Sequence, residues 1–230
     1  MMPIVSFRFA KSNWHQTGAH SYDYKGSVQI IVQNLAYDKQ VSMWAKVGGK
    51  WQDIFARFVE SLPGNLELWV TDATCNENDF VEFVAKYTVK GVTYWDNNAG
   101  RNYQFPREAG ESGFASGLQY PVVLSSASLS NLGGIPISGM LNVTAAVQNL
   151  AFNKVVGIVY TTNNWGLVGT AYGSYYRTLG SGLELWRIQA PVQDPSGGHY
   201  MEGRFAIFYR VLGNEYWDNN FSRNYFVPQY

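Results

Sequence analysis

The chain has 230 residues, of which only 15% are charged while 16% are aromatic. Charged residues usually make up about 25% of a soluble domain, and here 17 Lys+Arg balance 17 Asp+Glu to a formal net charge of zero. This balance excludes a strong electrostatic attraction to nucleic acid, an anionic membrane or an acidic substrate, and it favours a neutral ligand. Since no apolar run reaches the roughly 18 residues that span a bilayer, membrane insertion is not expected.

Taken in chain order, the predicted elements are short segments in which apolar and polar residues alternate. Such alternation is typical of half-buried β-strands, and it is clear in residues 28–32, 141–145 and 205–209. Residues 89–95 and 211–217 each have a Gly between two strand-like halves, which is typical of a β-hairpin. No segment has the spacing of a sustained amphipathic helix, so we predict an all-β fold built from β-sandwiches.

The second half of the chain repeats the first. Three pairs of segments match closely: 32–39 with 147–154, 66–69 with 183–186, and 94–98 with 216–220. The last pair is Tyr-Trp-Asp-Asn-Asn, followed in both copies by Arg-Asn-Tyr. The order is kept, and the offset between the copies grows from 115 to 122 residues because the second copy carries small insertions. The repeat indicates two homologous domains of about eight strands each.

These repeats set the expected domain boundaries. We expect one domain over residues 1–106 and a second over residues 120–230. The segment between them, 107–119, is rich in Gly, Glu and Ser and is predicted to be a linker.

The abundant aromatic residues suggest a chemistry for the neutral ligand. The apolar C–H face of a pyranose stacks on a Trp or Tyr ring, and its hydroxyls need uncharged hydrogen-bond partners such as Asn. Trp95 and Trp217 each precede an Asp-Asn-Asn sequence, so each copy joins a stacking ring to amides. The candidate amides are Asn97, Asn98, Asn219 and Asn220. The alternative interpretation is a buried aromatic followed by an ordinary turn.

The repeated motifs also resemble a known family. Asn-Leu-Ala-(Tyr/Phe)-x-Lys-x-Val, followed by Tyr-Trp-Asp-Asn-Asn and Arg-Asn-Tyr, is similar to the starch- and glycogen-binding carbohydrate-binding modules of family 21, with the family 53 modules close behind. The resemblance covers nearly all of both copies. It implies two tandem immunoglobulin-like β-sandwiches without catalysis, which bind α-1,4-glucan through aromatic residues at two surface sites each.

The first of the sites implied by the resemblance uses a Trp on a loop and the second aromatic of the Tyr-Trp-Asp-Asn-Asn motif. The loop residue is matched by Trp165 and, less closely, by Trp51; the motif residue is Trp95 or Trp217. A third aromatic of the family falls on Val84 and Ala206, so it is missing in both copies.

The second implied site uses the aromatic of the Asn-x-Ala-(Tyr/Phe) sequence, which is Tyr37 in one copy and Phe152 in the other. A further aromatic on a later loop is matched by Phe58 and Tyr176. The expected ligand is therefore a neutral glycan of the starch or glycogen type, or another neutral sugar. Two modules on one chain would add avidity.

An enzyme is the weaker interpretation. A glycosidase needs two carboxylates across a cleft, and Asp96 with Glu67, or Asp218 with Glu184, could be nominated. The Leu-Glu-Leu-Trp sequence predicts outward glutamates, and the aspartates suit turns. The three histidines are scattered and Cys75 is the single cysteine. We therefore expect neither a metal site nor a cofactor, and a non-catalytic, lectin-like protein.

Two other functions stay open: a binding module detached from an amylolytic enzyme, and a glycogen-targeting scaffold of a protein phosphatase. Family 21 modules of phosphatase-targeting subunits accompany a short Val-x-Phe docking motif, and Val5-Ser6-Phe7 has this form. The same residues fall where the first strand of the sandwich is expected. The N-terminal residues show no secretion signal, so a cytoplasmic location is expected.

Overall fold

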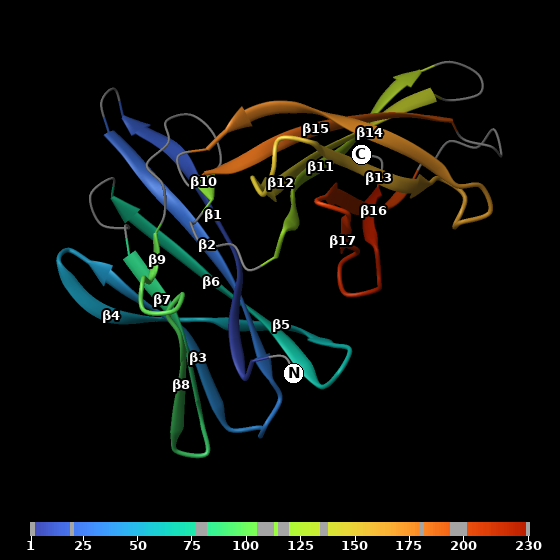
Figure 1. The fold of residues 1–230 in the computed structure, drawn as a ribbon. Helices are drawn as coiled ribbons and strands as arrows, with labels where there is room; N and C mark the ends of the chain where they lie inside the picture. The colour runs from blue at the N-terminus through green and yellow to red at the C-terminus, as the bar shows by residue number, and fades with distance from the viewer. Residues whose placement is uncertain are drawn as a thin grey trace. The chain divides into compact units, whose positions relative to one another are not determined.

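A computed structural model gives the structure of the chain. It describes residues 3–18, 21–76, 82–104, 113–114, 120–133, 138–179, 182–193 and 202–228. The chain folds as two compact units, residues 1–119 and, apart from residues 179–181, residues 120–230. The described residues of both units form strands and turns and no helix, so the all-β fold is confirmed (Figure 1).

The first unit has two antiparallel sheets. Its strands are β1 (Val5–Gly18), β2 (Ser21–Gln33), β3 (Lys39–Val47), β4 (Lys50–Phe55), β5 (Arg57–Leu62), β6 (Leu66–Asn76), β7 (Glu82–Val89), β8 (Val92–Asp96), β9 (Tyr103–Gln104) and β10 (Gly113–Phe114). One sheet has the order β10-β1-β2-β6-β5, and the other has the order β4-β3-β7-β8, with β9 paired to β7. The hydrophobic core takes residues from both sheets, including Phe7, Ile30, Met43 and Phe83. The unit is therefore a β-sandwich.

The second unit repeats these elements in one continuous sheet. Its strands are β11 (Val122–Gly133), β12 (Ser138–Gln148), β13 (Lys154–Thr161), β14 (Gly169–Thr178), β15 (Leu183–Gln193), β16 (Glu202–Val211), β17 (Asn214–Asp218) and β18 (Tyr225–Pro228). The order is β11-β12-β15-β14-β13-β16-β17, and β18 also pairs with β16. Strand β14 joins the two layers because it pairs with both β13 and β15.

Both predicted hairpins form. Strands β7 and β8 are joined at Lys90 and Gly91, and strands β16 and β17 at Leu212 and Gly213. All four turn residues have φ between 51° and 75°, which is the conformation of the type I′ turn that matches the twist of a hairpin.

Part of the predicted linker has regular structure. Gly113–Phe114 form β10 and pair with Lys11 and Ser12 of β1. The residues on either side of β10, 105–112 and 115–119, lie outside the described residues.

The aspartate of each Tyr-Trp-Asp-Asn-Asn motif fastens the first strand of its unit. Asp96 accepts hydrogen bonds from the Phe7 amide at 2.6 Å and the Tyr103 hydroxyl at 2.8 Å. Asp218 accepts equivalent bonds from the Leu124 amide at 2.7 Å and the Tyr225 hydroxyl. Both carboxylates therefore serve the fold, since a buried acceptor needs such donors.

Candidate functional site

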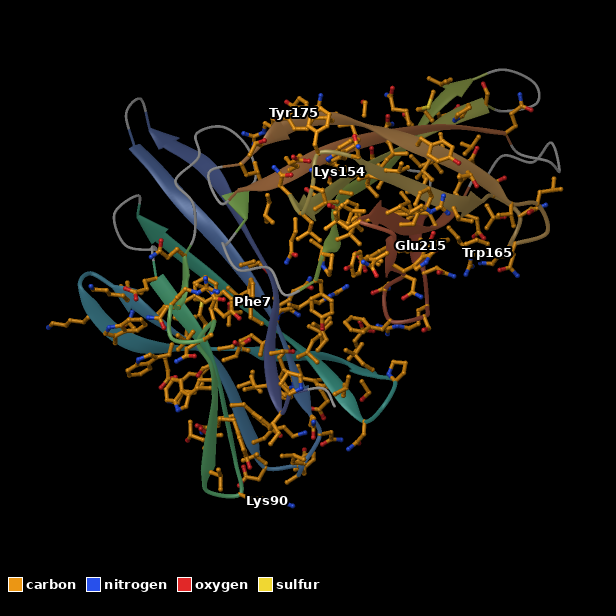
Figure 2. All side chains as sticks on the ribbon, in the orientation of Figure 1. Phe7, Lys90, Lys154, Trp165, Tyr175 and Glu215 are labelled. Atoms are coloured by element: carbon orange, nitrogen blue, oxygen red, sulfur yellow. The ribbon has the colours of Figure 1, made fainter. Side chains whose placement is uncertain are left out.

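A groove in the second unit surrounds the loop that carries Phe152. Its volume of about 1350 Å³ exceeds the roughly 300–1,000 Å³ of ordinary small-molecule pockets. Its lining includes Phe152, Tyr175, Trp186 and the β16–β17 turn. Figure 2 shows three groove residues, Lys154, Tyr175 and Glu215, on this unit. A groove of this volume can hold a ligand larger than an ordinary small molecule.

Two aromatic rings offer stacking faces in this groove. The Phe152 side chain is 96% exposed and that of Tyr175 is 53% exposed. Exposed rings of this size are costly in water unless a partner covers them. Phe152 was expected to contribute, but the second ring differs from the expectation.

Tyr176, which the family resemblance selected, lies outside the groove lining. The Arg187 guanidinium sits 3.3 Å from the centre of the Tyr176 ring and covers it. A register shift between Tyr175 and Arg177 on β14 puts Tyr176 at a bulge. Tyr175 instead pairs with Trp186 and packs edge-on against it, with ring centres 6.2 Å apart. Strand register, which the sequence did not reveal, therefore places Tyr175 and not Tyr176 in the lining of this groove.

A buried ion pair supports the groove. Lys154 Nζ lies 2.8 Å from Glu184 Oε2, and their side chains are only 3% and 9% exposed. Lys154 also donates to Asn149 Oδ1 at 2.6 Å, and the Trp186 indole donates to Glu184 at 3.0 Å. The predicted outward direction of Glu184 is wrong, because the carboxylate is turned into this network. The network holds Trp186 behind Tyr175.

A buried tyrosine hydroxyl also fixes the loop before Phe152. The Tyr209 hydroxyl donates to the Gln148 carbonyl at 2.7 Å, and the Leu150 amide donates to the same carbonyl at 3.0 Å. Burial raises the pKa of Tyr209 above its ordinary value, against the opposing effect of the Leu150 amide. Tyr87 has the same pattern in the first unit: it donates to Gln33 at 2.9 Å, and burial raises its pKa.

Tyr209→Phe should loosen the Phe152 loop and reduce the alkaline sensitivity of the second unit. A raised tyrosine pKa means that the folded state keeps the proton longer than the unfolded state, so its contribution is present below about pH 10 and is lost as pH rises further. The free energy of unfolding of the wild type should fall above pH 10, by at most about 1.4 kcal/mol per pH unit for each tyrosine. The variant should lose part of that slope. Denaturant unfolding between pH 8 and 11 measures it, and equal slopes would contradict the assignment.

A smaller pocket of about 390 Å³ lies at the other predicted site of the second unit. It is lined by Val159, Trp165, Ala206, Trp217, Asn219 and Asn224. The structure therefore brings Trp165 and Trp217 together, as expected. Ala206 forms part of the lining where the family has its third aromatic, so this pocket offers two rings only.

The Trp217 ring is held from its own strand. Its indole donates to Glu215 at 2.7 Å, and Arg210 also donates to that carboxylate. The hydrogen bond from Arg210 and, to a smaller extent, the one from Trp217 hold the pKa of Glu215 below its usual range. Glu215 therefore accepts hydrogen bonds from both side chains and keeps the Trp217 ring in place.

The predicted amide partners serve mainly their own turns. Asn98 and Asn220 adopt positive φ, and their side-chain amides donate to the carbonyls of Asn102 and Asn224. Asn97 accepts from the Gly100 amide. The turn interpretation accounts for these contacts. Of the two predicted amides in the second unit, Asn219 is among the residues that line the pocket and Asn220 is not.

The first unit carries an equivalent of the Phe152 groove network. Tyr37 is fully exposed, Phe58 is 47% exposed, and the Phe58 ring packs edge-on against Trp69 at 5.6 Å. Lys39 lies 2.7 Å from Glu67, which also accepts from the Trp69 indole at 2.9 Å. The predicted outward direction of Glu67 is therefore also wrong.

The other predicted site of the first unit contains a residue that sequence reasoning missed. Trp51 and Trp95 are exposed as expected, and Val84 is buried. Trp44 lies opposite Val84 in the register of β3 and β7 and contacts both tryptophans, with ring centres 6.4 Å from each. The signal was present in the sequence: Ser42, Trp44 and Lys46 alternate with inward Val41, Met43 and Ala45.

The carboxylates that were nominated for catalysis, Asp96, Glu67, Asp218 and Glu184, all have structural partners. The four nominated carboxylates are engaged by the Lys-Glu-Trp networks or by the first strands. The structure shows no group of three or more His, Cys, Asp or Glu that could hold a metal ion in the part of the chain it describes. His20 and His199 lie outside that part, as do the side chains of His15 and Cys75. Nor do the described residues include a helix with the length and apolar character needed to cross a membrane.

Comparison with known proteins identifies the second unit. It is a carbohydrate-binding module: residues 118–228 match the carbohydrate/starch-binding module, family 21. The chain thus contains one module of family 21.

Named relatives cover parts of the chain. Glucoamylase 1 of Rhizopus oryzae is 39% identical over 93 residues, which are 36% of this chain and 15% of that protein. Protein phosphatase 1 regulatory subunit 3E of Mus musculus is 33% identical over 120 residues, which are 50% of this chain and 38% of that protein. The chain therefore spans well under half the length of these relatives.

One solved structure is similar as well. It shows the starch-binding domain of Rhizopus oryzae glucoamylase in complex with beta-cyclodextrin and maltoheptaose. It is 31% identical, covers 45% of this chain and 96% of that chain, and has a TM-score of 0.34.

Proposed function

We propose that the protein is a non-catalytic, lectin-like binder of neutral glycans, with α-glucan of the starch or glycogen type as the preferred ligand. One observation carries this proposal: the family 21 module presents the exposed rings of Phe152 and Tyr175 over a buried Lys154–Glu184 support. The relatives add support, since one is an amylolytic enzyme and a solved relative was bound to maltoheptaose.

The proposal includes a second module in the first half of the chain, so that two immunoglobulin-like sandwiches lie in tandem over residues 1–106 and 120–230. The supporting observation is the repeated network, in which Lys39, Glu67 and Trp69 make the same contacts as Lys154, Glu184 and Trp186. A single exposed site of this type is expected to bind with a Kd near 1 mM, about 4 kcal/mol. Two sites on one polymer can add roughly 10² to 10⁴ in avidity.

Co-sedimentation with insoluble starch tests the proposal. The full chain should be retained, and soluble glycogen or maltoheptaose should release it. A crystalline β-linked glucan is the control matrix. If the chain stays in the supernatant with starch, the α-glucan assignment is wrong; equal retention on both matrices would make the ligand a different neutral glycan.

A phosphatase scaffold is the second candidate, and its support is the similarity to protein phosphatase 1 regulatory subunits. Docking through Val5 and Phe7 is disfavoured, because both side chains are buried in β1 and Phe7 belongs to the core. A pull-down of the folded chain with the phosphatase catalytic subunit tests this function. Capture that survives Val5→Ala would place the contact elsewhere on the chain, and no capture would end the candidate.

A further inference from the structure

The outward face of β3, β4 and β8 in the first unit carries a cluster of three tryptophans. The Trp44 and Trp51 rings are nearly parallel, with an interplanar angle of 11°, whereas Trp95 stands at 78° to Trp44. Trp51 and Trp95 are exposed and Trp44 is half-buried. The cluster therefore has two accessible rings around a covered one.

An ion pair lies at the centre of these rings. Lys86 Nζ donates to both carboxylate oxygens of Asp53, at 2.8 and 3.1 Å, and the Ser42 hydroxyl donates to the same carboxylate at 2.6 Å. The ammonium lies 4.9 Å from the centre of the Trp44 ring and 5.5 Å from that of Trp95, within the range of a cation–π interaction. Both charged side chains keep 22% of their surface exposed, so a ligand can reach them.

The second unit has no such ion pair at the corresponding positions. Strand register makes Val159 and Thr170 the counterparts of Trp44 and Asp53. Phe208 faces Trp217 as Lys86 faces Trp95. Phe208 is buried between Tyr172 and Trp217. The two units therefore offer different chemistry on the same sheet face.

We propose that Asp53 and Lys86 form a hydrogen-bonding site for the vicinal hydroxyls of a neutral pyranose, specific to the first unit and held in place by Trp44. One sugar hydroxyl donates to Asp53 and its neighbour accepts from Lys86, while the apolar face of the sugar rests on Trp51 or Trp95. Because the pair is electrically neutral as a whole, it offers no net attraction to an anionic sugar. This inference rests on the proposed function, since it assumes that the chain binds glycans.

The pair also explains why the site can be selective. Hydrogen bonds to charged groups are stronger than neutral ones and depend on direction. A sugar whose adjacent hydroxyls cannot reach both charges would leave one of them poorly solvated. The second unit has Phe208 in place of Lys86 and Thr170 in place of Asp53, so it lacks these two charged hydrogen-bond partners at the corresponding positions.

Fluorine NMR of the full chain labelled with 5-fluorotryptophan tests the inference, because each of the 8 tryptophans gives its own signal. Single Trp→Phe variants assign the signals, and maltoheptaose is the titrant. In the wild type the Trp51 and Trp95 signals should shift to saturation. In Asp53→Asn/Lys86→Met, which removes both charges and keeps the side-chain sizes, the midpoint for these two signals should rise at least about tenfold. The Trp165 and Trp217 signals should keep their midpoints.

Glu202→Gln/Arg204→Met is the matched control, because it removes another ion pair whose cation lies 5.2 Å from an aromatic ring centre, that of Phe226. It should change none of these midpoints. The inference is overturned if the Asp53/Lys86 variant keeps the wild-type midpoint, or if Trp51 and Trp95 stay silent while Trp165 and Trp217 respond. If no tryptophan responds, the proposed function itself fails.

Discussion

Lys154→Met should destabilise the second unit by about 3–5 kcal/mol, because it leaves the Glu184 carboxylate buried without its cation. Glu184 is only 7% exposed, so water cannot replace the ammonium. The same change releases Asn149 and weakens the position of Trp186. The methionine side chain fills similar volume, so loss of charge and hydrogen bonds dominates the effect.

Hydrogen exchange of β13 and β15 in the full chain measures this loss within the second unit. Arg204→Met is the control, because the Glu202–Arg204 pair is 38–40% exposed and such pairs contribute about 1 kcal/mol or less. Lys154→Met/Glu184→Gln should recover much of the stability by removing the unpaired charge. A loss below about 1 kcal/mol in the single variant would show that the buried pair does not support the groove.

Phe152→Ala/Tyr175→Ala should remove most α-glucan binding by the second unit. Burying one face of each ring under a sugar contributes about 1–2 kcal/mol by area, so loss of both weakens binding roughly 30- to 1000-fold. The rings are exposed, so the fold should remain, as circular dichroism can check. Isothermal titration with maltoheptaose measures the loss, with any residual heat assigned to the other sites.

Two tyrosines of the same strand serve as controls. Tyr172→Ala removes an exposed ring outside the groove lining, and Tyr176→Ala removes the ring that the family resemblance selected. Both should leave the affinity within about threefold of the wild type, since neither ring lines the groove. If Tyr176→Ala lowers the affinity for maltoheptaose more than Tyr175→Ala does, then Tyr176 is the binding residue. The strand register would then not determine which tyrosine binds.

Periodicity and repetition predicted much of the fold. Alternation indicated the strands, and Gly91 and Gly213 indicated the hairpins, since these signals are local. The continuity of β14 between two layers was not predictable, because strand pairing depends on contacts far apart in the sequence. The pairing of Gly113–Phe114 with β1 was missed for the same reason.

The residues of the candidate sites were predictable from the sequence where they belong to a recognisable motif. Phe152, Trp165 and Trp217 were found from motifs and line grooves or pockets of the second unit. Tyr175 was missed because a bulge sets which tyrosine of β14 faces the groove, and a bulge shifts the alternation by one residue. Glu184 was predicted to point outward because alternation cannot show that a lysine from another strand pairs with it.

Maltoheptaose titration of the wild-type chain, followed at the Trp186 indole N–H by NMR, tests the central claim most directly. That indole donates to Glu184 and its ring contacts Tyr175, so it senses the groove without being required for stacking. The account predicts a saturable shift with a Kd near 1 mM or tighter, which is absent in Phe152→Ala/Tyr175→Ala. A Trp186 signal that stays fixed at saturating maltoheptaose, or one that shifts equally in the double variant, would contradict the account.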